Sequence, residues 1–151
     1  MAAIDVARYL LNLSTPFTGE SVTNLKLQKL LYYAQGFHLA LHGTPLFDED
    51  IQAWAHGPVV PEVYFQYKGY QFSDIEEKYP EQTIIITSNQ RELINDVWEV
   101  FKSYDGKELE RLSHTEDPWK NARGNLPEYA SSNVIIEKDL IKLYFENEYV
   151  R

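Results

Sequence analysis

One segment of the chain, residues 53–64, restricts its backbone more strongly than any other. It reads Ala-Trp-Ala-His-Gly-Pro-Val-Val-Pro-Glu-Val-Tyr. Proline has no backbone N–H, and the residue before a proline is driven towards extended geometry, so the step from Gly57 to Pro58 cannot lie inside a helix. Pro61 suits the first turn of a helix, where an N–H would have no partner. We therefore expect a rigid turn that leads into a helix, with geometric roles for these three residues.

The length and composition favour an ordinary globular protein. A chain of 151 residues can bury a core of its own, and we expect one domain over residues 1–151. The absence of cysteine excludes a disulfide scaffold and a thiol nucleophile. No apolar run approaches the roughly 20 residues of a membrane span, and no basic leader is present, so we expect a cytoplasmic protein without a membrane partner. The net charge of −9 makes nucleic-acid binding unlikely and favours basic partners.

The spacing of apolar residues predicts a mainly α-helical fold with at most a small β-hairpin. The clearest helix begins near Thr23 or Asn24, which can cap it, and ends at Gly43, which suits a left-handed helix end. Further helices are expected near residues 4–11, 61–68, 88–104, 107–112, 118–123 and 137–147. Residues 83–87 have strand composition, and residues 134–136 are their expected partner in the hairpin. On the same pattern we expect the following residues to be buried: Leu41, Val100, Tyr104 and Leu140.

Two groups of residues are candidates for contact with a partner. Lys26, Lys29 and Tyr33 share one face of the long helix, away from its leucine stripe, and we expect that face to point to solvent. It is either a contact surface or simply a solvated basic face with an amphipathic tyrosine. Trp54 and Tyr64 are large aromatic residues, which serve either as core residues or as interface anchors.

The candidates for catalysis and metal binding are weak. His38 and His42 have the i, i+4 spacing of a metal-binding pair, but a third ligand would have to come from His56, His114 or a carboxylate. Leu39 stands where a helical zinc protease has its catalytic glutamate, so two surface imidazoles are the simpler interpretation. Ser113 adjoins His114, so their side chains point apart, and no nucleophile elbow or phosphate loop is present. The sequence predicts no enzyme, no cofactor and no metal.

Three segments together resemble the Panacea antitoxin domain, a family that includes SocA-like proteolytic adaptor antitoxins and phage-associated GepA-like proteins. The first segment, residues 23–37, contains the run TNLKLQKLLYYAQ, and the second is residues 53–64. The third, residues 112–123, contains His114, Pro118 and Trp119, to which we assign structural roles. The sequence Gly-Thr-Pro-Leu-Phe at residues 43–47 supplies the family's turn between the first two.

The resemblance implies a binding protein. It would be the antitoxin of a toxin–antitoxin system, with a cognate toxin as its partner and neutralisation by direct contact. An adaptor that delivers the toxin to a host protease is the alternative within this family. A DNA-binding regulator is disfavoured because no predicted helix carries a basic stripe, and a metal-dependent enzyme is disfavoured as above. The predicted contact residues are Lys26, Lys29, Tyr33, Trp54, His56, Val59 and Tyr64. Gly57, Pro58 and Pro61 would fix the angle between the helices that present these contact residues.

Overall fold

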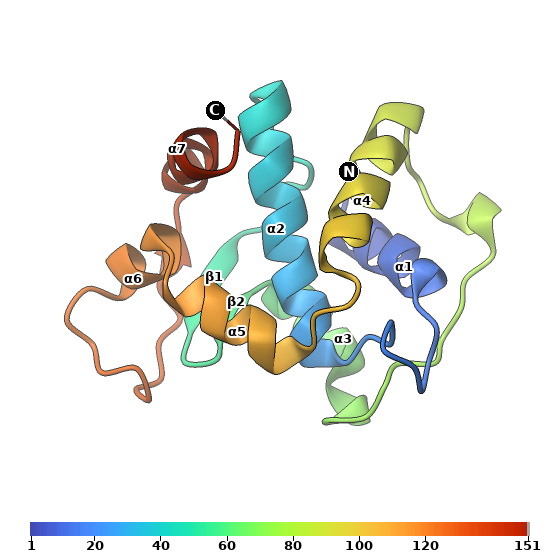
Figure 1. Cartoon of the computed structure of the whole chain (residues 1–151), viewed down its shortest axis with the longest axis horizontal. Coiled ribbons are helices and arrows are strands. Elements are labelled where there is room, and N and C mark those ends of the chain that lie inside the picture. The colour runs from blue at the N-terminus through green and yellow to red at the C-terminus, as the bar shows by residue number, and fades with distance from the viewer. Residues whose placement is uncertain (151) are drawn as a thin grey trace.

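A long central helix, surrounded by shorter helices, organises the computed structural model, which describes residues 1–150 (Figure 1). The prediction of a mainly α-helical fold is confirmed. The central helix α2 packs against α1, α3, α4, α5, α7 and strand β2. The elements are α1 (Ala3–Leu13), α2 (Asn24–His42), β1 (Ile51–Trp54), β2 (Gly57–Val59), α3 (Pro61–Tyr67), η1 (Lys68–Tyr70), η2 (Glu81–Thr83), α4 (Ser88–Phe101), α5 (Gly106–His114), α6 (Asp117–Arg123), β3 (Ile135–Ile136) and α7 (Lys138–Glu148).

The ends of two helices follow directly from the sequence. The Thr23 side chain accepts a hydrogen bond from the backbone N–H of Lys26 at the start of α2, and Gly43 closes the helix with a φ of 78°. At the start of α4, Thr87 and Gln90 form a reciprocal capping box. For α2, one of the two predicted N-terminal caps, Thr23, and the predicted C-terminal residue Gly43 are those that the structure uses.

The small sheet differs from the predicted hairpin. Its strand order is β2-β1-β3, with β1 antiparallel to both neighbours. Residues 135–136 do form a strand, but they pair with β1, and residues 83–87 form no strand. Ile84 is instead buried in the core, which explains the strand-like composition, because β-branched residues suit any half-buried extended segment. Pro58 lies in β2, an edge strand, where its missing N–H is tolerated.

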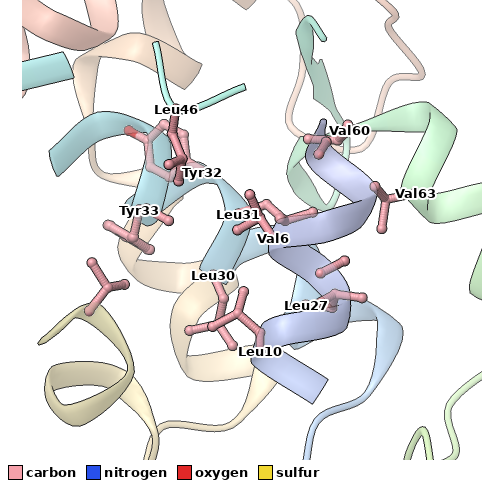
Figure 2. Close-up of a cluster of buried hydrophobic side chains, with 14 of the residues drawn as sticks. Val6, Leu10, Leu27, Leu30, Leu31, Tyr32, Tyr33, Leu46, Val60 and Val63 are labelled. Carbon is pink, nitrogen blue, oxygen red and sulfur yellow. The ribbon is translucent and has the colours of Figure 1, made fainter. Parts of the chain in front are cut away.

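The core has its centre at α2. Figure 2 shows Val6 and Leu10 of α1 beside Leu27, Leu30 and Leu31 of α2, and all five side chains are fully buried. On another side of α2, helix α7 approaches closely at Gly36: a Cβ atom added there would lie 2.4 Å from the Phe145 ring. Four residues predicted to be buried are exposed instead: Leu41, Val100, Tyr104 and Leu140. Within residues 1–150, none of the helices is both long and apolar enough to cross a membrane.

Candidate partner-binding site

The polar side chains of the first signature segment are buried and hold neighbouring segments in place. The side-chain oxygen of Gln28, Oε1, accepts a hydrogen bond from the backbone N–H of Val60 at 2.9 Å, just after β2. Gln35 accepts the N–H of Leu46 at 2.7 Å and donates to the carbonyl of Phe47 at 2.8 Å. Buried polar groups need such partners, so these residue types are required to fix the hairpin and the 43–47 turn against α2. These polar residues of the family motif therefore stabilise the fold.

Lys26, Lys29 and Tyr33 do not form the solvent-facing surface that the sequence predicts. Their exposed fractions are 2%, 0% and 0%. The expectation of exposure is wrong because α4, α5 and β2 pack against this part of α2, so its second face is buried as well as its leucine stripe. A contact role for these three residues stays a prediction.

Both lysines donate to backbone carbonyls. Lys26 Nζ donates to the carbonyl of Lys102 at 2.5 Å, just beyond the end of α4. Lys29 Nζ lies beneath the turn between β1 and β2 and donates to the carbonyl of Pro58 at 3.1 Å. Burial lowers the pKa of Lys29 from 10.5 to about 7, and the nearby charge of Glu110 opposes that shift only in part. Gly57 lies over this lysine and has a φ of +107°. A Cβ atom added at Gly57 would lie 2.8 Å from Lys29 Cε.

A buried carboxylate, Glu116, is held by three tyrosines. Its Oε1 accepts hydrogen bonds from Tyr32 at 3.0 Å and Tyr33 at 3.2 Å, and its Oε2 accepts one from Tyr149. Burial raises the pKa of Glu116, while the three hydrogen bonds act in the opposite direction. The cluster joins α2 to the start of α6 and to the C-terminal end of α7, so its effect is to close the fold.

The third signature segment supports the hairpin from the other side. The His114 and Trp119 rings stack with centroids 3.9 Å apart, and the Arg123 guanidinium lies 4.9 Å from the Trp119 ring centroid. Trp119 Nε1 donates to the carbonyl of Trp54 at 2.8 Å, and Arg123 donates to that of Ala53 at 3.0 Å. These contacts fix the end of β1. Pro118 is buried beside them in the first turn of α6, and Pro61 begins α3 as expected.

The remaining predicted contact residues lie together around one depression, which we call the aromatic groove. It has a volume of 370 Å³ between the N-terminal half of α2, the hairpin, α3 and α5. Its lining includes Lys29, Trp54, His56, Val59, Tyr64, Lys68, Phe72, Lys107 and Glu110. Among the predicted residues, His56 is largely exposed, Trp54 and Tyr64 are half-buried, and Val59 is buried. With the buried Lys29 at its base, the structure thus brings together five of the seven predicted contact residues around an accessible groove.

Aromatic rings line this groove and continue beside it. Trp54 and Tyr64 are in edge contact, with ring centroids 4.9 Å apart, and Phe65 lies 5.5 Å from Tyr64. Phe65 is 60% exposed and Phe72 is 93% exposed. Neither phenylalanine was predicted as a contact residue from the sequence. Phe65 stands next to Tyr64 on a short helix, and Phe72 stands in an otherwise polar loop. Neither belongs to a periodic apolar pattern, and this was the available sign that they are exposed.

The groove is locally cationic although the chain is acidic overall. Lys68 and Lys107 lie on its rim, and Lys68 Nζ is 5.8 Å from the Phe65 ring centroid. Within residues 1–150, Glu110 is the one carboxylate of the lining, and its Oε1 is 3.1 Å from His56 Nδ1 and 3.7 Å from Lys107 Nζ. A groove with this charge complements acidic rather than basic groups.

The histidine pair on α2 lies at the opposite end of that helix. The rings of His38 and His42 have centroids 4.8 Å apart, and His38 Nδ1 is 2.6 Å from the carbonyl oxygen of Thr44. A carbonyl only accepts, so Nδ1 carries the hydrogen in this contact. Burial lowers the pKa of His38. Within residues 1–150, no three side chains of the histidine, aspartate or glutamate type are grouped so that they could hold a metal ion.

Comparison with known proteins gives one family and one relative. The family described as "Antitoxin SocA-like, Panacea domain" matches residues 27–120, which include the aromatic groove's hairpin, α3 and α5. The protein named Antitoxin SocA from Caulobacter vibrioides (strain NA1000 / CB15N) is 51% identical over 43 residues. That alignment covers 28% of this chain and 23% of the relative, so less than a quarter of the relative's length is represented. No solved structure matches the chain.

Proposed function

Because the chain belongs to the Panacea domain family of SocA-like antitoxins, we propose that it neutralises a cognate toxin by direct protein–protein binding. The contact surface in this proposal is the aromatic groove. No catalytic step is involved, since the antitoxin would act by covering a surface that the toxin needs.

The observation that carries the proposal is the exposed aromatic cluster beside the hairpin. Trp54, Tyr64 and Phe65 form a contiguous group of rings on β1 and α3, and Phe72 stands largely in solvent nearby. Tryptophan and tyrosine supply much of the binding energy in protein interfaces, and exposed apolar clusters on small proteins commonly mark such interfaces. The hairpin behind them is held rigidly by α2 and α6, so little ordering would be required on binding.

The charges at the rim narrow the kind of toxin surface that would fit. Lys68 and Lys107 flank the aromatic cluster, so the complementary segment would have acidic groups beside an apolar centre. Rim charges of this kind act mainly on the rate of association and on its salt dependence. The apolar centre would supply most of the affinity.

A growth assay tests the proposal. Each small gene adjacent to the one that encodes this chain is expressed alone and together with it. The proposal expects one of them to arrest growth and this chain to relieve the arrest. Phe72→Glu, at an exposed residue that lines the groove, should weaken the relief, while Ile85→Glu, a matched change at an exposed apolar residue outside the groove, should preserve it. Unchanged arrest with every adjacent gene would contradict the proposal.

A protease-deficient host separates neutralisation by binding from delivery to a protease. Binding alone predicts relief of arrest in a host that lacks its ATP-dependent proteases, with the toxin remaining at constant abundance. Delivery to a protease predicts a different result: the relief of arrest disappears in that host, and the toxin is stable there but short-lived in the parent strain. That result would support the adaptor alternative in place of the proposal.

A further inference from the structure

A second groove lies between the C-terminal half of α2 and helix α4, with a volume of 280 Å³. Figure 1 shows the end of α2 and the beginning of α4 at the same end of the molecule. The floor of the groove is apolar, with Phe37, Leu93 and Val97. Leu41 and Val100 also line it and are 55% and 61% exposed. These two side chains continue the apolar faces of their helices, yet nothing in residues 1–150 covers them.

The groove also has an acidic edge, and we therefore call it the acidic groove. Glu92 and Asp96 lie one turn apart on α4, are exposed, and line the groove. Neither carboxylate makes an ion pair or a side-chain hydrogen bond with another residue of the described chain. Two like charges at this spacing destabilise a helix slightly, so the stability of α4 does not account for them. No lysine or arginine lines the groove within residues 1–150.

We propose that the acidic groove binds an amphipathic helical segment of a partner protein, with apolar residues on one face and lysines or arginines beside them. A pair of packed helices with an apolar seam presents a surface into which a third helix can place its apolar face.

Charge decides which occupant fits. Glu92 and Asp96 would attract cationic side chains at the border of the apolar seam. A second copy docked through the same groove fits poorly, because it would bring its own Glu92 and Asp96 to the acidic edge. The acidic groove shares no lining residue with the aromatic groove, so this inference does not rest on the contact surface proposed for the toxin.

The test uses a designed peptide and the full chain. The probe is a helical peptide of about 14 residues with leucines at helical spacing on one face and lysines on the other. A second peptide has glutamate in place of each lysine. Binding is measured by calorimetry. The proposal expects the leucine–lysine peptide to bind and the leucine–glutamate peptide not to bind.

Variants show whether the peptide occupies the groove. Val100→Glu and, separately, Leu41→Glu should each weaken binding about tenfold or more, since each introduces a charge on the apolar seam. The double change Glu92→Gln with Asp96→Asn should weaken it several-fold. The control, Glu76→Gln with Glu128→Gln, makes the same change in net charge at exposed positions outside the groove and should have little effect.

Three outcomes would overturn the proposal. The first is failure of the leucine–lysine peptide to bind. The second is equal loss of binding in the groove variant and in the control, which would indicate general attraction to an acidic protein. The third is a dimer that Val100→Glu dissociates, which would identify a second copy as the occupant. All the substitutions are at exposed positions, so melting temperatures should stay close to that of the unmodified chain.

Discussion

Replacement of Lys29 by methionine should remove a large pH-dependent contribution to stability. The Lys29 ammonium group is fully buried and has the carbonyl of Pro58 as its acceptor. Burial lowers its pKa from 10.5 to about 7, because the charged form is poorly solvated there. Methionine fills a similar volume with a flexible apolar chain and has no group that titrates.

The sign of the effect follows from proton binding in the two states. In the unfolded chain Lys29 keeps its proton up to about pH 10, whereas in the folded chain it releases the proton above about pH 7. Between these values the unfolded state binds more protons, so the free energy of unfolding rises with pH. For this one group the rise from about pH 7 to about pH 9 amounts to about 2 kcal/mol, and Lys29→Met should lack it.

Urea denaturation of both proteins at several pH values in this range measures the effect. The difference in unfolding free energy should move in favour of the unmodified chain as pH rises. Lys26 and Lys78 also have lowered pKa values, but they contribute equally to both proteins and cancel in the comparison. Lys120→Met, at an exposed lysine on α6 outside this groove, should run parallel to the unmodified chain. Parallel curves for Lys29→Met as well would refute the argument and show that this ammonium group is hydrated in the folded protein.

Four further substitutions test the packing around α2 by denaturant titration. Glu116→Ala should lower the unfolding free energy by about 2–4 kcal/mol, because three tyrosine hydroxyls lose their acceptor; a loss below about 1 kcal/mol would mean that water replaces the carboxylate. Gly57→Ala should cost about 2–3 kcal/mol, from its positive φ and the close lysine carbon, whereas Gly43→Ala, with a positive φ and open space, should cost about 1 kcal/mol. Equal losses at the two glycines would argue against the close contact. Gly36→Ala should cost about 1–3 kcal/mol by forcing apart α2 and α7, and an unchanged stability would show that the facing ring moves freely.

The helices of this protein could be predicted from the sequence, because their boundaries depend on local chemistry. Thr23 and Gly43 at the ends of α2, and the capping box at Thr87, satisfy backbone groups close by in the chain. The environment of α2 could not be predicted in the same way. Lys26 and Lys29 lie on a regular polar face of the helix, which the sequence pattern predicts to be exposed to solvent. That face is buried only because elements distant in sequence pack against it.

The sheet shows the same limit. The segment at 83–87 has strand composition but packs without pairing, while β1 and β2 pair within a segment that contains a glycine followed by a proline. Strand pairing depends on which segments meet, and composition reports only that a segment is extended and half-buried. The exposed residues on α2 and α4 illustrate the converse: Leu41 and Val100 continue apolar faces and were predicted to be buried, and the structure leaves them uncovered beside an acidic edge.

The candidate site was predicted in part. Trp54 and Tyr64 were singled out as large aromatics next to a rigid turn, and the structure puts both on the aromatic groove. Phe65 and Phe72 were missed, because a single exposed aromatic residue has no periodic signal in a sequence. The cationic character of the rim was missed for a related reason: Lys68 and Lys107 are 39 positions apart and meet only in the folded chain.

The most direct test of antitoxin action through the aromatic groove is amide hydrogen exchange on the complex with the growth-arresting neighbour, purified after co-expression. The account predicts that exchange slows on complex formation in the hairpin and α3, residues 51–67, and in the segment that carries Phe72. It predicts no comparable slowing in the exposed segment 124–134. Absence of a complex, or slowing confined to elements outside the groove, would contradict the account.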